Sequence, residues 1–136
     1  MSSLRVDAVE LVDTDKLLLL TRASHETNAP LYIETINYYV YLLAHEVGFN
    51  YAFRFMPKPI SYDLSEDLRD LKDAQYISWG SRIEITDKGL SSTENYLQDQ
   101  EVKKMFQEMK NYLKANSQYN ELELFQRAYN IATKGI

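Results

Sequence analysis

The chain contains no cysteine, which excludes disulfide bonds, a thiol nucleophile and any cysteine-ligated metal. Glycine is also scarce, since only four occur, at positions 48, 80, 89 and 135. Glycines this far apart cannot build a Gly-rich phosphate-binding loop, and no Gly-x-Ser-x-Gly motif is present. The absence of cysteine fits a reducing, cytoplasmic environment.

Long apolar runs are missing as well. The longest purely apolar run is Leu17–Leu20, which is far too short to span a membrane. The chain begins Met-Ser-Ser-Leu-Arg-Val-Asp, with an acidic residue where a signal peptide would start its apolar segment. We therefore expect a protein that carries no export signal and does not cross or bind a membrane.

Metal and catalytic motifs are absent from the sequence. Its two histidines occur as His25-Glu26 and His45-Glu46. Neither belongs to a zinc-binding His-Glu-x-x-His motif, because the residue four positions after each histidine is Ala29 or Phe49. We expect no metal site, no cofactor and no catalytic residues, and hence a protein that is not an enzyme.

Length and composition are typical of one soluble globular domain covering residues 1–136. The chain has 136 residues, of which 45% are hydrophobic and 26% charged, with a net charge of −5. A protein that grips the nucleic-acid backbone usually shows a basic balance or a basic face, because neutralising phosphates supplies much of its affinity. The charge balance therefore disfavours nucleic-acid binding, although it leaves room for a local basic patch.

The stretch 60–89 predicts a short helix followed by a β-hairpin. On the helix, Leu64, Leu68 and Leu71 fall within roughly 60° of one another and form a core stripe beneath a mostly acidic face. Residues 76–79 and 82–86 then alternate around Gly80-Ser81, which is a two-residue hairpin signal, and a Thr-Asp-Lys-Gly turn follows. A helix followed by a hairpin is the second half of a winged helix-turn-helix.

The residues before this stretch complete an expected winged-helix core over 14–89. Periodicity leaves residues 4–12 open between helix and strand, and we favour helix. A helix from 14 to 22, a polar linker over 24–30 and a central helix over Leu31–Val47 follow. The alternating aromatic residues of 49–55 predict a strand, which we expect to pair with the hairpin in a small antiparallel sheet. The predicted fold class is therefore α+β.

Residues 90–136 are expected to form a C-terminal helical extension. Two apolar stripes at helical spacing mark its helices, Val102, Phe106, Met109 and Leu113 in the first and Leu122, Phe125, Tyr129 and Ala132 in the second. Such stripes either complete the core of the monomer or form a homodimer interface. Covering the core is the simpler interpretation, and isologous pairing would be the usual geometry of a dimer.

With these elements placed, a family resemblance becomes visible. The run YVYLLAHEVGFNYAFRF (39–55), followed by Pro59-Ile60-Ser61-Tyr62-Asp63-Leu64 and Asp67-Leu68-Arg69-Asp70-Leu71, resembles the YwgA-like uncharacterised proteins and the related SocA-type (Panacea) antitoxin domain. The family's Gly-Pro-Tyr-Ser turn is Lys58-Pro59-Ile60-Ser61 here, so Pro59 and Ser61 match. The resemblance covers about 17–89 and implies a winged-helix fold with regulation or partner binding, without catalysis.

The expected helix after Ser61 is the first candidate site. Between Asp63 and Asp73 it carries five acids against two bases, a net charge of −3. In a DNA-binding winged helix the exposed face of this element would lie in the major groove. A unit negative charge about 6 Å from a phosphate costs roughly 0.7 kcal/mol even at the dielectric constant of water. We therefore expect this face to be solvated or to dock on a basic partner surface, and not to read DNA.

The hairpin tip is the second candidate site. Trp79 is the only tryptophan and lies beside Gly80-Ser81-Arg82. Trp and Arg are frequent anchors at protein interfaces, so Trp79 either contacts a partner or folds back on its own sheet. The partner-binding residues predicted from the sequence are Glu66, Asp70, Asp73, Trp79 and Arg82. The preferred function is a non-enzymatic regulatory or adaptor protein, either antitoxin-like or similar to the uncharacterised family, that binds a protein partner.

A basic patch gives the alternative function. Arg54, Lys58, Arg82 and Lys88 could gather near the strand and the wing and contact phosphates. In that case the protein would be a dimeric DNA-binding transcriptional regulator, with the acidic helix turned away from the DNA. The two hypotheses differ in whether these four cations share one surface.

Overall fold

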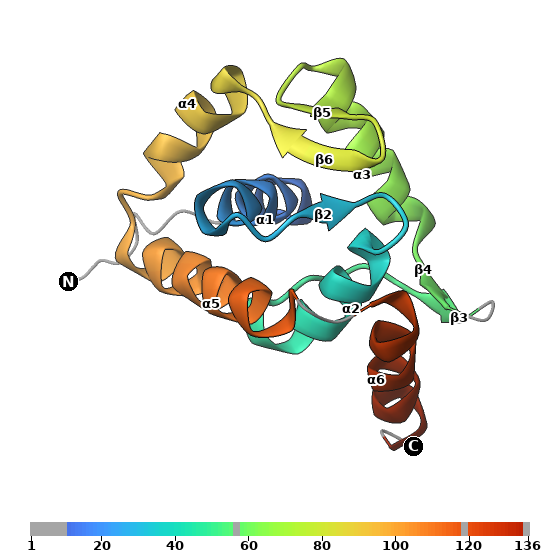
Figure 1. Cartoon of the computed structure of the whole chain (residues 1–136). Helices are drawn as coiled ribbons and strands as arrows, with labels where there is room; N and C mark the ends of the chain where they lie inside the picture. The colour runs from blue at the N-terminus through green and yellow to red at the C-terminus, as the bar shows by residue number, and fades with distance from the viewer. Residues whose placement is uncertain (1–10, 56–57, 118–119, 135–136) are drawn as a thin grey trace.

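A computed structural model describes residues 11–55, 58–117 and 120–134, and this part of the chain is an α+β structure with six helices and small antiparallel sheets. The elements are α1 Asp13–Thr27, β2 Leu31–Tyr32, α2 Ile36–Val47, β3 Arg54–Phe55, β4 Pro59–Ile60, α3 Tyr62–Asp73, β5 Ile77–Trp79, β6 Arg82–Ile85, α4 Asp87–Tyr96, α5 Gln100–Asn116 and α6 Glu121–Lys134. Helix α1 runs through the middle of the molecule (Figure 1).

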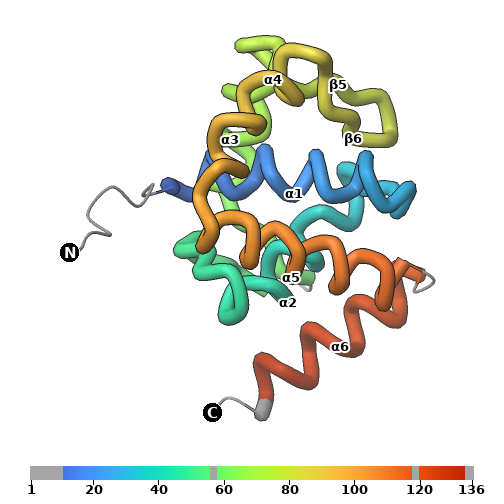
Figure 2. Tube along the Cα trace, turned by 90° about the vertical axis from the view of Figure 1, so that its left-hand side faces the viewer, coloured from blue at the N-terminus to red at the C-terminus, as the bar shows by residue number. Residues whose placement is uncertain are grey.

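Helix α1 is covered from two sides. The sheet and α4 lie on one side of it, and α2 and α5 lie on the other (Figure 2). Its four consecutive leucines, Leu17–Leu20, are each at most 3% exposed. A helix that is enclosed in this way needs apolar residues around most of its circumference, which explains the longest apolar run of the sequence.

The predicted polar linker over 24–30 is wrong for its first half, because α1 continues to Thr27. Ala23 and Ser24 are buried, and Asn28 ends the helix in the left-handed conformation with φ of 58°. Most of the ambiguous segment 4–12 lies outside the described residues. Its last two positions, Leu11 and Val12, are described, and both precede α1.

The predicted hairpin is confirmed, but its third strand is a different one. Strands β5 and β6 pair antiparallel, and the sheet order is β2-β6-β5, with Leu31 of β2 opposite Ile83 of β6. The predicted helix over Leu31–Val47 is therefore wrong at its start, since α2 begins only at Ile36. Residue Leu31 is fully buried in the sheet.

The predicted strand over 49–55 is also wrong in extent and in partner. Only Arg54–Phe55 is extended, as β3, and it pairs with β4, Pro59–Ile60, in a separate two-stranded ribbon. The aromatic residues ahead of β3 pack sideways on helices and do not join the sheet, since Tyr51 donates to Asp67 of α3 and Phe53 lies 5.2 Å from Tyr41 of α2. The aromatic pattern of this segment thus reflects packing on α2 and α3.

In the C-terminal segment, α5 covers the core as predicted, whereas α4 is an additional helix. Helix α5 packs on α1 and α2 through its buried stripe of Val102, Phe106, Met109 and Leu113, as predicted. Helix α4 was not predicted, because the expected turn at 86–89 is its start. The Thr86 side chain accepts a hydrogen bond from the Gly89 amide at 3.1 Å and caps it.

Helix α6 is present, but the expectation that its predicted stripe covers the core of the monomer is wrong. The residues that it buries against the rest of the molecule are Leu124 and Ala128. Of the predicted stripe, Leu122 is 64% exposed and Tyr129 is 53% exposed. The apolar stripe visible in the sequence is therefore not the one that closes the core of the monomer.

A cluster of charged residues ties three helices together. Arg22 of α1 pairs with Glu26 at 2.8 Å and with Glu94 of α4 at 2.5 Å, and Lys110 of α5 reaches Glu26 at 3.3 Å. Burial opposes ionisation of Glu26, but the hydrogen bonds from Arg22 and Lys110 outweigh it and lower the pKa of the carboxyl. The Arg22 side chain is only 12% exposed, so this network belongs to the packed interior more than to the surface.

The depressed pKa of Glu26 predicts a dependence of stability on pH. Because the folded-state pKa lies below the ordinary value of 4.5, the contribution of Glu26 is complete above that value and is lost as the pH falls through the folded-state pKa. The difference in free energy of unfolding between the wild type and Glu26→Gln should therefore be constant at neutral pH and shrink in acid. Urea unfolding at several pH values measures it. A difference independent of pH would contradict this role.

Within the described parts of the chain, none of the helices combines the length and the apolar character that a bilayer crossing requires.

Candidate functional site

Helix α3 is positioned at its N-terminus and along one side. Ser61 caps its N-terminus by accepting a hydrogen bond from the Leu64 amide at 3.2 Å, and the Ser61 amide donates to Asn37 of α2 at 3.0 Å. Leu64, Leu68 and Leu71 are buried beneath it. The core stripe predicted from the sequence is confirmed, and the helix is held with its opposite side in solvent.

The solvent side of α3 carries the predicted acids. Glu66, Asp70 and Asp73 are all exposed. At 100° per residue these three lie within roughly 60° of one another and on the far side of the helix from the buried leucines. Asp63, which is also exposed, extends the same arc by about 20°. The four carboxylates therefore form one continuous strip, which we call the acidic strip (Asp63, Glu66, Asp70 and Asp73).

Each edge of the exposed face of α3 contacts another part of the fold. At one edge, Lys72 lies over the Trp79 ring, with its Nζ 5.1 Å from the ring centroid. At the other edge, Asp67 accepts a hydrogen bond of 2.6 Å from the Tyr51 hydroxyl. Burial and this bond to a carboxylate raise the pKa of Tyr51, so the phenol stays protonated and donates. On the Trp79 side, Arg69 and Lys72 lie between the acidic strip and the ring, whereas on the other side the strip ends beside Asp67 and Tyr51.

Trp79 and Arg82 do not share a surface. Trp79 lies directly opposite Ile83 in the hairpin, so their side chains are on the same face of the sheet, whereas Arg82, next to Ile83, points to the other face. Trp79 is half-buried and packs on the core beside Lys72. Trp79 therefore contacts α3, whereas Arg82 lies on the opposite face of the sheet.

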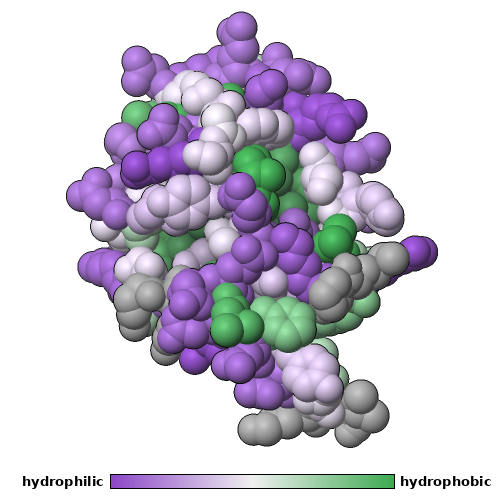
Figure 3. All heavy atoms as spheres, turned by 45° about the vertical axis from the view of Figure 1, so that its right-hand side comes forward, coloured by the Kyte–Doolittle hydropathy of each residue, from purple (hydrophilic) through white to green (hydrophobic). Residues whose placement is uncertain are grey.

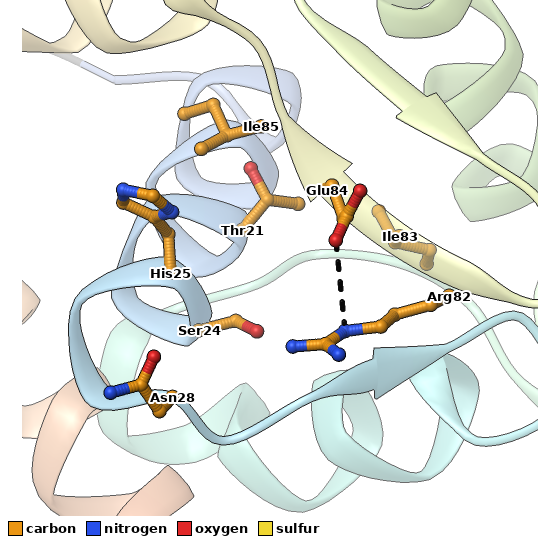
Figure 4. A pocket seen from close by; sticks show the side chains of 8 residues that line it. All are labelled: Thr21, Ser24, His25, Asn28, Arg82, Ile83, Glu84 and Ile85. Carbon is orange, nitrogen blue, oxygen red and sulfur yellow. Dashed lines mark ion pairs between the residues drawn. The ribbon is translucent and has the colours of Figure 1, made fainter.

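Arg82 lines a polar hollow between β6 and the end of α1. Its guanidinium extends from β6 towards α1 and pairs loosely with Glu84 at 3.9 Å (Figure 4). The cavity measures about 240 Å³ and is lined by Thr21, Ser24, His25 and Asn28 of α1 and its end, with Arg82 to Ile85 of β6. Both hydroxyls are already used as donors, Thr21 to the Leu18 carbonyl and Ser24 to the Ala29 carbonyl.

The four cations of the alternative hypothesis are dispersed. Lys58 pairs with Glu121 of α6 at 3.4 Å, and Lys88 donates to the Ala74 carbonyl at 2.7 Å beside the Tyr76 ring. Arg54 is exposed on β3 in the two-stranded ribbon, and Arg82 is engaged with Glu84. Lys88 belongs to the first turn of α4, which begins beyond the end of β6 that is remote from the hairpin turn (Figure 1). These residues therefore do not form one basic surface.

One surface feature escaped the sequence predictions. A groove of about 370 Å³ separates α2 and the segment 51–55 from the C-terminal half of α6. Its walls are mainly apolar, with Tyr41, Phe53 and Phe55 on one side and Ile131 and Ala132 on the other. The Tyr41 ring contacts Phe53 and Phe55 edge to face, each at 5.2 Å between centroids. The alternating aromatics of 49–55 were the available signal, but they were assigned to a strand.

His25 and His45 are exposed on α1 and α2. Among residues 11–55, 58–117 and 120–134, no group of three or more His, Asp or Glu side chains is arranged to hold a metal ion.

Comparisons with known proteins add no family to these observations: no protein-family model, no curated protein and no solved structure matches this chain.

Proposed function

We propose that residues 13–85 form a winged helix. The order along the chain is helix, strand, helix, helix and hairpin, and β2 pairs with the second strand of that hairpin, which is the arrangement of a winged helix. The β3-β4 ribbon between α2 and α3 is an insertion into this pattern. On this proposal α3 occupies the recognition-helix position and the β5-β6 hairpin is the wing.

We further propose that the protein is a non-enzymatic regulator or adaptor that binds a basic segment of a protein partner through α3. The observation that carries this proposal is the acidic strip, four exposed carboxylates on the outer face of the recognition-helix position, with Trp79 held at its edge by Lys72. Exposed carboxylates on one helix face suit Lys and Arg side chains, because each acid can pair with a positive charge. The resemblance to the SocA-type antitoxin domain supports the same class of function.

The charge distribution favours a protein partner over DNA. The acidic strip would face phosphates at close range, and each such pair is repulsive. Three of the four cations available for backbone contacts are engaged within the chain, Lys58 with Glu121, Lys88 with Ala74 and Arg82 with Glu84. Freeing them would subtract from any affinity gained through counterion release.

A titration followed by Trp79 fluorescence tests the proposal. Trp79 is the only tryptophan, so its emission reports on the edge of the exposed α3 face without background. We expect a short Lys- and Arg-rich peptide to change the emission at about 50 mM salt, and more weakly at about 300 mM as the charges are screened. Random duplex DNA should produce no change. A salt-sensitive response to DNA would overturn the proposal and support the transcriptional regulator.

Neutralised variants show whether the acidic strip is responsible. The triple variant Glu66→Gln, Asp70→Asn, Asp73→Asn should bind the peptide roughly 10- to 30-fold more weakly, since exposed ion pairs contribute up to about 1 kcal/mol each. The matched control is Glu34→Gln, Glu101→Gln, Glu108→Gln, which removes the same charge from exposed sites outside α3. Equal losses in both triple variants would mean that only the net charge of the protein is sensed, and would contradict a site on α3.

A further inference from the structure

Helix α6 carries two apolar stripes, and only one of them packs against the rest of the monomer. Leu124 and Ala128 are buried against the rest of the molecule, in contact with α2. The second stripe is formed by Leu122, Phe125, Tyr129 and Ala132, spaced by three, four and three residues. At 100° per residue this stripe is turned by roughly 100° from the inward one, so it lies along the flank of the helix.

The second stripe is open to solvent at its large side chains. Leu122 is 64% exposed and Tyr129 is 53% exposed, and the Phe125 and Tyr129 rings stack with centroids 6.1 Å apart. Apolar side chains reach the surface in the lower part of the molecule, at the level of α6 (Figure 3). Spacings of three and four residues are those of the seam between two helices that pack along their length.

The stripe has one charged neighbour, Glu121 at its N-terminal end, which pairs with Lys58 at 3.4 Å. The residues that border it on its outer side are Gln126 and Thr133, whereas Glu123 and Arg127 project from the other side of α6. Arg127 is directed to Tyr112 of α5, where it interacts with the phenol. Buried interface centres are depleted of charged residues, and this flank meets that requirement.

We propose that this flank of α6 is the interface of a symmetric homodimer, in which two α6 helices pack antiparallel about a two-fold axis. A two-fold axis level with position 127 places Leu122 opposite Ala132 of the second copy and Phe125 opposite its Tyr129, so each large side chain meets a smaller one or a ring. The stripe is therefore complementary to itself under the symmetry that closed dimers use.

Net charge restricts where two copies can meet. Each chain carries a net charge of −5, so two copies repel wherever charged faces meet, and a flank whose apolar stripe is itself uncharged is where they can approach. Antiparallel packing also sets the positive end of each helix dipole beside the negative end of the other.

The dimer is independent of the function proposed for α3. Figures 1 and 2 place α3 and α6 in opposite halves of the molecule, above and below α1. Dimerisation through α6 leaves both acidic strips accessible, so the assembled protein would present two of them. Failure of one proposal would not imply failure of the other.

Sedimentation equilibrium of the full chain tests the dimer. We expect a species of twice the 15.9 kDa monomer mass at about 100 μM protein, a concentration that detects dissociation constants well into the micromolar range. Leu122→Glu with Tyr129→Glu should raise the dissociation constant at least 100-fold, because each copy would bury two charges. Asn130→Glu, an exposed position away from the stripe, is the matched control, and circular dichroism checks that all variants remain folded.

Cysteine cross-linking tests the orientation, because the native chain has no cysteine to interfere. A mixture of Leu122→Cys and Ala132→Cys chains should form a disulfide-linked dimer, whereas neither chain should do so alone. In the antiparallel arrangement two copies of position 122 are about 15 Å apart along the helix, too far for a disulfide. A monomeric wild type, a dimer unaffected by the double Glu variant, or cross-linking of each chain with itself would overturn the proposal.

Discussion

Gly89→Ala is expected to lower the free energy of unfolding by about 2 kcal/mol, although alanine normally favours a helix over glycine by about 1 kcal/mol. Gly89 is in the first turn of α4 and is buried. A Cβ built on it would lie 2.6 Å from Cγ1 of Ile85 and closer still to the Tyr76 carbonyl oxygen. Neither neighbour yields easily, since one is backbone and the other is packed on the core, so the steric cost exceeds the gain in propensity.

The strain would fall on the junction between the hairpin and α4. The same Tyr76 carbonyl accepts hydrogen bonds from the Thr86 amide and the Thr86 hydroxyl, both at 3.0 Å. Urea unfolding measures the loss of stability. Gly80→Ala at the hairpin turn is the matched control, since a Cβ there meets nothing within 4 Å, and it should change stability by less than about 0.5 kcal/mol. Equal effects at the two positions would contradict the packing described for Gly89.

Arg22→Met is expected to cost about 2–4 kcal/mol of folding free energy, because it removes one partner from a network that burial has already desolvated. The Arg22 guanidinium donates to Glu26, to Glu94, to the Leu90 carbonyl at 3.1 Å and to the Thr93 hydroxyl at 2.9 Å. Burial alone would lower the pKa of Arg22, but the pairing with the two carboxylates raises it. Methionine preserves most of the side-chain volume and none of these bonds.

The consequence of Arg22→Met should be greatest where α4 meets α1. Three of the four partners of Arg22 belong to α4, so amide hydrogen exchange of α4 should accelerate more than that of α2. Arg69→Met on the exposed face of α3 is the matched control and should change stability by less than about 0.5 kcal/mol. If the two substitutions cost the same, the network contributes nothing beyond a surface ion pair.

Local patterns predicted the parts of the fold whose partners are close in sequence. Leu64, Leu68 and Leu71 identify the buried side of α3, and the alternation around Gly80-Ser81 identifies the hairpin. The two-residue turn predicted at Gly80-Ser81 is wrong, because Trp79 pairs with Ile83 and three residues therefore connect the paired positions. Gly80 also lacks the positive φ that a type I′ or II′ turn requires there. Gly48, which ends α2, does adopt a positive φ, of 75°.

The errors concern long-range partners. Leu31–Tyr32 is a strand because Ile83 and Arg82 pair with it fifty residues later, and no local pattern separates two extended residues from the helix that follows. Helix α6 has apolar residues on two sides, and periodicity cannot say which side the rest of the chain covers. Helix α4 was not predicted because Gly89 was interpreted as part of a turn. The small size of Gly89 is instead needed for its packing on Tyr76.

The candidate site was predictable only where its residues lie close together in the sequence. Glu66, Asp70 and Asp73 share a helix face, so their grouping follows from spacing alone. Arg54, Lys58, Arg82 and Lys88 lie on different elements, and their distribution depends on the tertiary fold. The separation of Trp79 from Arg82 follows from strand alternation once the register with Ile83 is known.

The most direct test of the account is to map, residue by residue, where a Lys- and Arg-rich peptide binds, using amide chemical shifts of the isotope-labelled protein. Binding through the acidic strip predicts that the shifts concentrate on residues 61–74 of α3 with its cap and on Trp79, and that α5 and α6 are unaffected. Shifts centred on α5, on α6 or on the hollow beside Arg82 would contradict a partner site on α3.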